Sequence, residues 1–210
     1  MRGTVQVFVE GGGSGNTQQH SDFRHGWSTF LSELRIIAQD NGYESLKIVR
    51  GKGRAMTFES FKKHKKKSPD DLCVLLVDSE TSAPFTTNVW DIVRNHEGDG
   101  WQKPAWATEQ HLYLMAHFVE TWLLTDQEAL RTFFRKGFNA KPLPTTDLEN
   151  RSKGDVNKAL HEATKNAQRG AYRHGQAHEI IELVCPERVK TLSHGKRLFE
   201  EMNQLLTKRT

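Results

Sequence analysis

Short runs of apolar residues predict the β-strands of this chain. Residues 5–9, 46–49 and 72–77 form three such runs, and the last is the most apolar stretch of the sequence. A continuous apolar run is typical of a strand that is covered on both faces, as the strands of a parallel sheet are. A fourth strand is expected over residues 111–117.

Segments with helical spacing of apolar residues alternate with these runs. A helix is expected over residues 23–39, capped by Ser21 or Asp22, and a short basic helix over residues 57–66. The resulting β-α-β-α-β order predicts an α/β fold with a parallel sheet between helices. Further helices are expected over residues 89–95, 119–124, 127–134, 155–168, 176–183 and 196–206.

The character of the sequence changes along the chain and indicates two parts. Residues 81–108 are loop-rich, and Trp90, Trp101 and Trp106 are expected to fix this insertion to the core. Beyond Pro142 and Pro144 the sequence turns polar and mainly helical. We therefore predict an α/β domain over residues 1–135 and a helical C-terminal extension over residues 136–210 that packs on it.

Length, charge and cysteine usage narrow the class of protein. The chain has 210 residues, a net charge of +4 and two cysteines, Cys73 and Cys185. No apolar run approaches the roughly 20 residues that cross a bilayer, and the first residues lead directly into a strand rather than a signal peptide. Two cysteines in apolar contexts cannot build a disulfide scaffold. A cytoplasmic protein with no membrane partner is the expectation.

A concentrated basic block follows the second predicted strand. Such a block suits a polyanion and favours nucleic acid as a partner, although a solvated helix face would have the same composition. The residues that would steer a phosphate backbone are Lys52, Arg54, Lys62, Lys63, Lys65 and Lys66.

Acidic residues follow two of the predicted strands. Glu10 ends the first strand, and Asp78 and Glu80 end the most apolar one. Ligands of open parallel sheets bind outside the carboxyl ends of the strands, so these carboxylates converge if the two strands are neighbours. Carboxylates held close together repel one another, and Mg²⁺ (or Mn²⁺) relieves that repulsion. Acids also end strands simply because loops are solvated.

Other chemistries remain as alternatives. The glycine cluster at residues 11–15 could serve a nucleotide-binding enzyme, but it lacks the third glycine of G-x-G-x-x-G and the lysine of a P-loop. His174 and His178 have the spacing of zinc ligands on a helix, without a third ligand at a motif spacing. His111 flanks the fourth strand and could face a phosphate, while Glu120 could join the acids or serve as a helix-start acid.

Three segments taken together resemble a bacterial family of Toprim-like proteins of unknown function, related in fold to the overcoming-lysogenization-defect (OLD) nucleases. They are VFVEGGGSG, LCVLLVDSE and HLYLMAHFVETWLLTD, and DGWQKPAWAT, LPTT, SKGDVNKAL and CPERV add to the match. The resemblance implies a Toprim-like sheet whose first glutamate is Glu10 and whose acid pair is Asp78 and Glu80. Here the pair reads Asp-x-Glu rather than the usual Asp-x-Asp.

The resemblance also implies a function. Glu120 matches the acid of the third segment, and Asp126, Lys153 and Tyr172 fall in matching segments. Glu10, Asp78, Glu80 and Glu120 would then be the catalytic residues of a Mg²⁺-dependent nuclease. DNA is favoured over RNA as its nucleic-acid partner, and the choice between them stays open. An ATPase of the ABC/OLD kind is the implied partner, in defence against phage. The alternative is a non-catalytic Toprim scaffold that acts as a partner or sensor subunit of such an ATPase.

Overall fold

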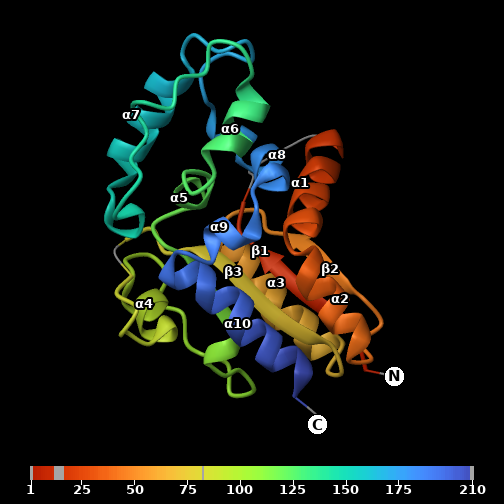
Figure 1. Cartoon of the computed structure of the whole chain (residues 1–210). Coiled ribbons are helices and arrows are strands. Elements are labelled where there is room, and N and C mark those ends of the chain that lie inside the picture. Colours follow the sequence, from red (N-terminus) through yellow and green to blue (C-terminus); the bar gives the residue numbers. More distant parts are fainter. Residues whose placement is uncertain (1, 12–16, 82, 209–210) are drawn as a thin grey trace.

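The computed structural model describes residues 2–11, 17–81 and 83–208. Its sheet has four parallel strands, β1 (Val5–Val9), β2 (Leu46–Arg50), β3 (Leu72–Asp78) and β4 (Leu112–Met115), in the order β2-β1-β3-β4 (Figure 1). Because every neighbouring pair is parallel, all four carboxyl ends lie at one edge of the sheet. The predicted α/β fold with a parallel sheet between helices is confirmed.

Side chains that alternate along the strands enter two separate cores. Val7, Leu76 and Met115 pack with the helices α1 (Thr17–Phe30), α2 (Ser32–Asp40) and α10 (Ser193–Thr207). Phe8, Leu75 and Leu114 belong to a second cluster with α3 (Arg54–Lys67) and α4 (Val89–Asn95). Successive residues of a strand point to opposite faces, so covering both faces requires the continuous apolar runs seen in the sequence.

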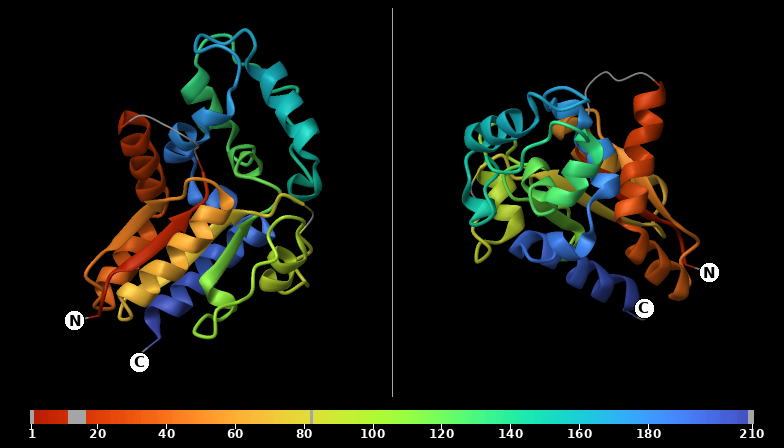
Figure 2. Two further views of the ribbon diagram at one scale, coloured as in Figure 1. Left: turned by 180° about the vertical axis from the view of Figure 1, so that it is seen from behind. Right: turned by 45° about the horizontal axis from the view of Figure 1, so that its top comes forward.

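Most of the helices that follow β4 lie beyond the carboxyl edge of the sheet (Figure 2). They are α5 (Glu120–Leu123), α6 (Gln127–Phe134), α7 (Lys153–Thr164), α8 (Ala177–Ile180) and α9 (Pro186–Val189), with single 3₁₀ turns at Leu148–Asn150, His174–Gln176 and Ile181–Leu183. A further 3₁₀ turn, Glu109–His111, directly precedes β4. After α9 the chain returns along the sheet as α10 (Figure 1). The C-terminal residues therefore share the core of the sheet as well as extending beyond its edge.

Several boundaries differ from the sequence prediction for local reasons. The helix expected over residues 23–39 is divided at Leu31 into α1 and α2, and α1 begins at Thr17, before the expected caps. α7 begins at Lys153 because the Ser152 hydroxyl accepts a hydrogen bond from the backbone N–H of Asp155 (3.1 Å). The fourth strand is shorter than expected and ends at Met115.

Two of the three tryptophans in the insertion fix it to the core. Trp90 and Trp101 are buried with Phe58 of α3, and the Trp90 indole N–H donates to the carbonyl of Thr108 (3.0 Å). Trp106 is 36% exposed and rests against Phe61, with ring centroids 4.8 Å apart. It contributes less to anchoring than the sequence suggested.

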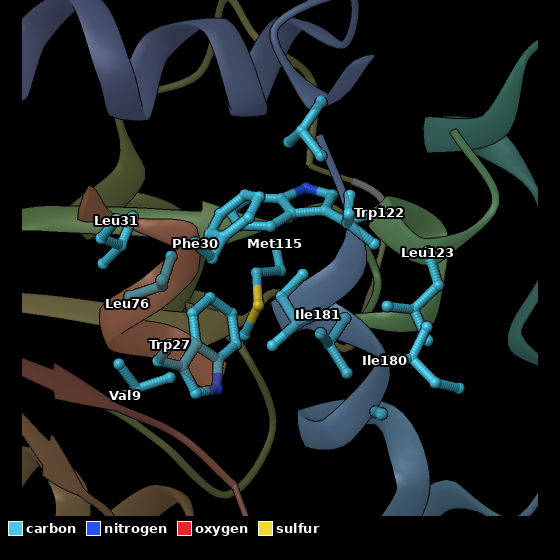
Figure 3. Packing of buried hydrophobic residues seen from close by; sticks show 14 of the residues in the cluster. Val9, Trp27, Phe30, Leu31, Leu76, Met115, Trp122, Leu123, Ile180 and Ile181 are labelled. Carbon is cyan, nitrogen blue, oxygen red and sulfur yellow. The ribbon is translucent and has the colours of Figure 1, made fainter. Parts of the chain in front are cut away.

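Aromatic rings join the sheet to the helices beyond its edge (Figure 3). Trp122 of α5 lies 6.2 Å from Trp27 and 5.8 Å from Phe30 of α1, measured between ring centroids. Leu76 and Met115 belong to the same cluster, and Figure 3 shows them beside these rings. Among the helices within the described residues, none combines the length and apolar character needed to cross a bilayer.

Replacing Leu76 with alanine should strongly destabilise the fold. Leu76 is fully buried on a central strand, so Leu76→Ala removes buried methylene groups and leaves a cavity, at a cost of about 2–5 kcal/mol. Urea denaturation followed by circular dichroism measures this loss. Ile36→Ala is the matched control, because Ile36 is 55% exposed and its truncation should change the free energy of unfolding by less than about 0.5 kcal/mol. Similar losses in both variants would contradict this description of the core.

Candidate functional site

The sheet topology places Glu10 against the end of β3. β1 and β3 are hydrogen-bonded neighbours with Val9 opposite Leu76, and the backbone N–H of Glu10 donates to the Leu76 carbonyl (2.9 Å). The backbone N–H of Asp78 in turn donates to Glu10 Oε2 (3.2 Å). Glu10 and Asp78, which the sequence suggested as converging acids, therefore lie in direct contact at the carboxyl edge.

Left-handed backbone conformations orient the residues that follow β3 and β4. Glu80 and His117 have φ angles of 59° and 57°, and the Glu80 N–H donates to the His117 carbonyl (2.9 Å). Ser79 Oγ accepts the N–H of His117 (2.7 Å), which joins the two strand ends a second time. This conformation costs a non-glycine residue on the order of 1–3 kcal/mol, and such residues cluster at functional sites. Strand pairing thus holds Glu80 beside the other acids.

Arg54, which the sequence assigned to phosphate steering, lies inside the acidic site. Its Nη1 is 3.0 Å from Glu10 Oε2 and also donates to the backbone carbonyl of Asp78, while its Nε is 2.7 Å from Asp99 Oδ2. Its guanidinium lies 4.9 Å from the centroid of the Trp101 ring. The insertion between β3 and β4 therefore holds Arg54 against Glu10.

Gly51 allows α3 to begin this close to the sheet. A Cβ atom at Gly51 would lie 1.7 Å from Thr57 Oγ1, so only glycine permits the first turn of α3 to pack on the end of β2. That turn carries Arg54, and β2 is the neighbour of β1. A backbone position without a side chain thus brings the arginine to the end of β1.

Glu120 is fully buried at the start of α5 and is held by residues from the C-terminal part. Its Oε1 accepts a hydrogen bond from the Tyr172 hydroxyl (2.6 Å) and one from His174 Nδ1. Burial acts to raise the pKa of Glu120, but the bonds from His174 and Tyr172 outweigh it and hold the pKa below its ordinary value. Glu120 is therefore a charged acceptor for these two donors.

Lys153 supplies a positive charge at the outer side of the acids. Its Nζ lies 3.2 Å from Glu80 Oε2 and 5.3 Å from the centroid of the Phe118 ring. Burial acts to lower the pKa of Lys153, but the contact with Glu80 and the charges of Asp78 and Glu120 together outweigh it and raise the pKa, which keeps the ammonium charged. The first residue of α7 thus neutralises a carboxylate at the end of β3.

Asp78 is the acid whose charge is least compensated. It is buried, and within the described parts of the chain its Oδ1 has no hydrogen-bond partner. Burial raises the pKa of Asp78 well above its ordinary value, and the nearby charges of Glu10, Glu120 and Glu80 raise it further. Burial also raises the pKa of Glu10, despite its ion pair with Arg54. These acids are close enough for each charge to disfavour its neighbours.

The donor chemistry of this cluster suits a hard cation, but cationic side chains already hold its members. Asp78 Oδ1 and Glu120 Oε2 are buried oxygens without partners in the residues described, and oxygen is the ligand that Mg²⁺ prefers. In the same residues, no group of three or more His, Cys, Asp or Glu side chains is arranged to hold a metal ion. Arg54 and Lys153 are the charges that an ion at Glu10 and Glu80 would replace.

The basic residues predicted to bind nucleic acid are divided between the two ends of α3. Lys52 is exposed in the loop before α3, near the carboxyl edge, whereas Lys62, Lys63, Lys65 and Lys66 occupy its second half. At 1.5 Å per residue these four lie roughly 12–18 Å along the helix from Arg54, toward the amino end of β3. Lys62 pairs with Glu59 (2.6 Å), and Lys65 donates to the backbone carbonyls of Pro69 and Asp71. They do not line the acidic cluster.

Asp126 and His111 form local contacts of their own. Asp126 Oδ1 accepts the N–H of Ala129 (3.1 Å) and caps α6, while its Oδ2 accepts the N–H of Cys185 (2.9 Å). His111 bonds to Thr108 just before β4, at the opposite end of that strand from the acids, and burial lowers its pKa to about 4. The structure brings neither residue to the acidic cluster.

The glycine cluster lies mostly outside the described residues, since residues 12–16 are not among them. Gly11 is described, and a Cβ atom there would lie 2.7 Å from the His178 ring and 2.8 Å from Phe23. His178 itself is buried and accepts a hydrogen bond from the Trp27 indole N–H (3.3 Å). His178 therefore packs against Gly11 and Trp27, whereas His174 bonds to Glu120, so the two histidines have different partners.

Tyr172, His174 and Asp99 are members of the site whose roles sequence reasoning did not identify. The family resemblance includes Tyr172 but gives it no role, the spacing of His174 points only to a pair with His178, and no motif points to a role for Asp99. Their partners are distant along the chain, since 54 positions separate His174 from Glu120 and 45 separate Asp99 from Arg54. The sequence offered a signal for Asp99 and Tyr172, which belong to the family resemblance, but none for His174, which lies outside the quoted segments.

The fold and site define an α/β protein with a buried carboxylate cluster at the carboxyl edge of a parallel sheet. The chain belongs to the family described as Domain of unknown function (DUF4276), which matches residues 28–203. No curated protein and no solved structure matches the chain. Glu10 precedes the matched segment, whereas Asp78, Glu80, Glu120 and His174 lie within it.

Removing the charge of Asp78 should stabilise the protein at neutral pH. The folded state raises the pKa of Asp78 above its ordinary value of 3.8, so it binds this proton more tightly than the unfolded chain does. The contribution of this group to stability therefore falls as pH rises through the raised pKa. In EDTA at pH 7, Asp78→Asn should melt several degrees above wild type, at about 2–4 °C for each kcal/mol.

The advantage of Asp78→Asn should disappear as the pH approaches ~4, where the native carboxyl is protonated as well. Asp40→Asn is the control, because Asp40 is exposed at the end of α2 and should show no such pH-dependent gain. An Asp78→Asn variant that melts below wild type at pH 7 would contradict the assignment of Asp78 as an uncompensated buried acid.

Proposed function

We propose that this protein is a metal-dependent phosphodiester hydrolase, a nuclease of Toprim type. The observation that carries the proposal is the buried Asp78 carboxylate, whose Oδ1 has no partner among the described residues and which lies near Glu10, Glu80 and Glu120. Glu10, Asp78 and Glu80 would hold Mg²⁺ or Mn²⁺, since a divalent cation relieves the repulsion among them. When bound, such an ion orients water and stabilises charge on a phosphoryl group.

Positive side chains beside the acids supply the groups that would bind the phosphate. Arg54 and Lys153 neutralise Glu10 and Glu80 in the structure, and an arriving cation would free both for a phosphodiester. Lys52 is exposed close by and adds positive charge. Nucleic acid is the proposed substrate, with DNA as the first to test, and the resemblance to Toprim-like proteins supports this choice. An ATPase of the ABC/OLD kind, acting in defence against phage, is the partner in the same proposal.

A second candidate function is a non-catalytic scaffold or sensor subunit of such an ATPase. The observation that favours it is the pairing of the acids with cations of the chain itself. Glu10 pairs with Arg54, Glu80 with Lys153 and Glu120 with His174. A network compensated in this way would hold the helices beyond the sheet edge without any metal ion.

Metal-linked stability and cleavage distinguish the two functions. For a nuclease, millimolar Mn²⁺ should raise the Tm of the wild type by several degrees, because a ligand that binds only the folded state stabilises it. Mn²⁺ should not raise the Tm of Asp78→Asn. Plasmid or oligonucleotide cleavage should fall at least ~100-fold in Asp78→Asn and Glu10→Gln, since even outer-sphere partners of a metal are worth roughly 10–100-fold.

Asp40→Asn is again the control and should match wild type in both measurements, because Asp40 is exposed and distant from the cluster. If Mn²⁺ leaves the wild-type Tm unchanged and no nucleic acid is cleaved, the nuclease proposal is wrong and the scaffold function is favoured. If Asp78→Asn cleaves as fast as wild type, the catalytic assignment of this cluster is wrong.

A further inference from the structure

His174 is an exposed histidine held by a fully buried carboxylate. Its Nδ1 bonds to Glu120 Oε1, and the Tyr172 hydroxyl bonds to the same oxygen (2.6 Å). The His174 side chain is 64% exposed, whereas that of Glu120 is 0% exposed. The imidazole therefore lies at the surface of the acidic site, where its Nδ1 is bonded to Glu120 and the rest of the ring is exposed.

The anchor determines which nitrogen can exchange a proton with a substrate. A carboxylate is only an acceptor, so the Nδ1 that faces Glu120 carries a hydrogen, and Nε2 is the nitrogen left to act. Among the described side chains, none forms a hydrogen bond with His174 Nε2. An imidazole oriented by a buried carboxylate through Nδ1, with Nε2 directed outward, has the arrangement required for proton transfer.

The charges around His174 favour its protonated form. Glu120 of α5 contacts it and Glu80 after β3 adds negative charge, while burial and Lys153 of α7 act in the opposite direction. His178 of α8 is also nearby, but burial and the charge of His174 lower its pKa to about 4, so it carries no charge at neutral pH. The hydrogen bond to Glu120 is the largest influence and raises the pKa of His174 above its ordinary value of 6.5. At neutral pH the ring therefore holds more of its second proton than a free histidine does.

We propose that His174 is the general acid of the phosphodiester hydrolysis and that its Nε2–H protonates the departing alcohol oxygen, an inference that rests on the function proposed above. Glu120 and Tyr172 are then positioning residues, since they act through the imidazole. This role also accounts for the burial of Glu120 away from solvent, because a fixed charge behind the ring stabilises the imidazolium without competing for the substrate.

The proposed step balances without a further reactant. The oxygen of a water molecule forms a bond to phosphorus, and the bond from phosphorus to the departing oxygen breaks. That oxygen takes the proton of His174 Nε2 and leaves as an alcohol. The attacking water keeps one hydrogen as the new P–OH group and releases the other to solvent, from which His174 regains its proton.

Two substrates with different leaving groups test the proposal. A DNA strand releases an alkoxide that needs a proton, whereas bis(p-nitrophenyl) phosphate releases a phenolate that leaves without one. His174→Gln should lower kcat/KM for DNA by roughly 10²–10⁴-fold, the usual contribution of acid catalysis, and should change that for bis(p-nitrophenyl) phosphate by less than about threefold. Retained turnover of the activated ester also shows that the variant is folded.

The pH profile provides a second signature. Wild-type kcat/KM for DNA should fall as pH rises through the pKa of His174, because the acid must be protonated, and this alkaline limb should be absent in His174→Gln. Glu120→Gln removes the charge that raises the pKa of His174, so the limb should move to lower pH. His161→Gln is the matched control, since His161 is exposed on α7. This variant should have the wild-type kcat/KM for both substrates.

The outcomes separate this inference from the proposed function. If wild type cleaves neither substrate, both fail. If wild type is active, Asp78→Asn is inactive and His174→Gln cleaves DNA at the wild-type rate, only the role of His174 is wrong. If His174→Gln loses both substrates equally, His174 acts in folding or in the positioning of the acids, and the acid assignment is again overturned.

Discussion

Parallel pairing of β1, β3 and β4 is the constraint on which the site depends. Because the strands run in one direction, residues that follow them in sequence meet at a single edge, whatever their separation along the chain. Glu10 Oε2 accepts a hydrogen bond from the backbone N–H of Asp78 as a direct result of this register. The apolar runs that drive the strands into the core also bury Asp78, which terminates the most apolar run. Hydrophobic burial of the sheet thus holds Asp78 out of water, next to other carboxylates that repel its charge.

Positively charged side chains from segments outside the strands compensate part of this negative charge. Arg54 comes from the start of α3, Lys153 from the start of α7 and His174 from the turn before α8, and each reaches one carboxylate. These contacts tie the helices beyond the sheet to its carboxyl edge, so the charge network is also a structural connection between the two parts. Asp78 receives least of this compensation, which marks it as the position where an external cation would bring the largest relief.

The strands and the meeting of the acids could be predicted from the sequence because both follow from local pattern and parallel topology. Residues 5–9 were predicted with the bounds that β1 has, and Glu10, Asp78 and Glu80 were placed by the strands that they follow. The partners could not be predicted in the same way. Arg54 belongs to a basic run whose composition is typical of a solvated face, and only the close packing allowed by Gly51 turns it toward Glu10.

The contacts of His174 could not be predicted from the sequence either. Its spacing from His178 suggested a shared helical face, but the chain passes through a 3₁₀ turn at His174–Gln176 before α8 begins. One histidine therefore reaches Glu120, while the other packs beneath Gly11. Long-range contacts between polar residues have no periodicity in the sequence, so neither position nor composition distinguishes these two histidines.

The site contains two kinds of carboxylate, and their environments shift their pKa values in opposite directions. Burial raises the pKa of Asp78 and of Glu10, whereas hydrogen bonds from His174 and Tyr172 hold that of Glu120 low although it is buried too. Neighbouring titratable groups whose environments separate their pKa values are the usual basis of acid–base division in an active site. A protein scaffold alone would need no such separation, since pairing every acid with a cation would hold the helices equally well. The opposite pKa shifts of Asp78 and Glu120 are therefore the feature that favours the proposed catalytic function over the scaffold function.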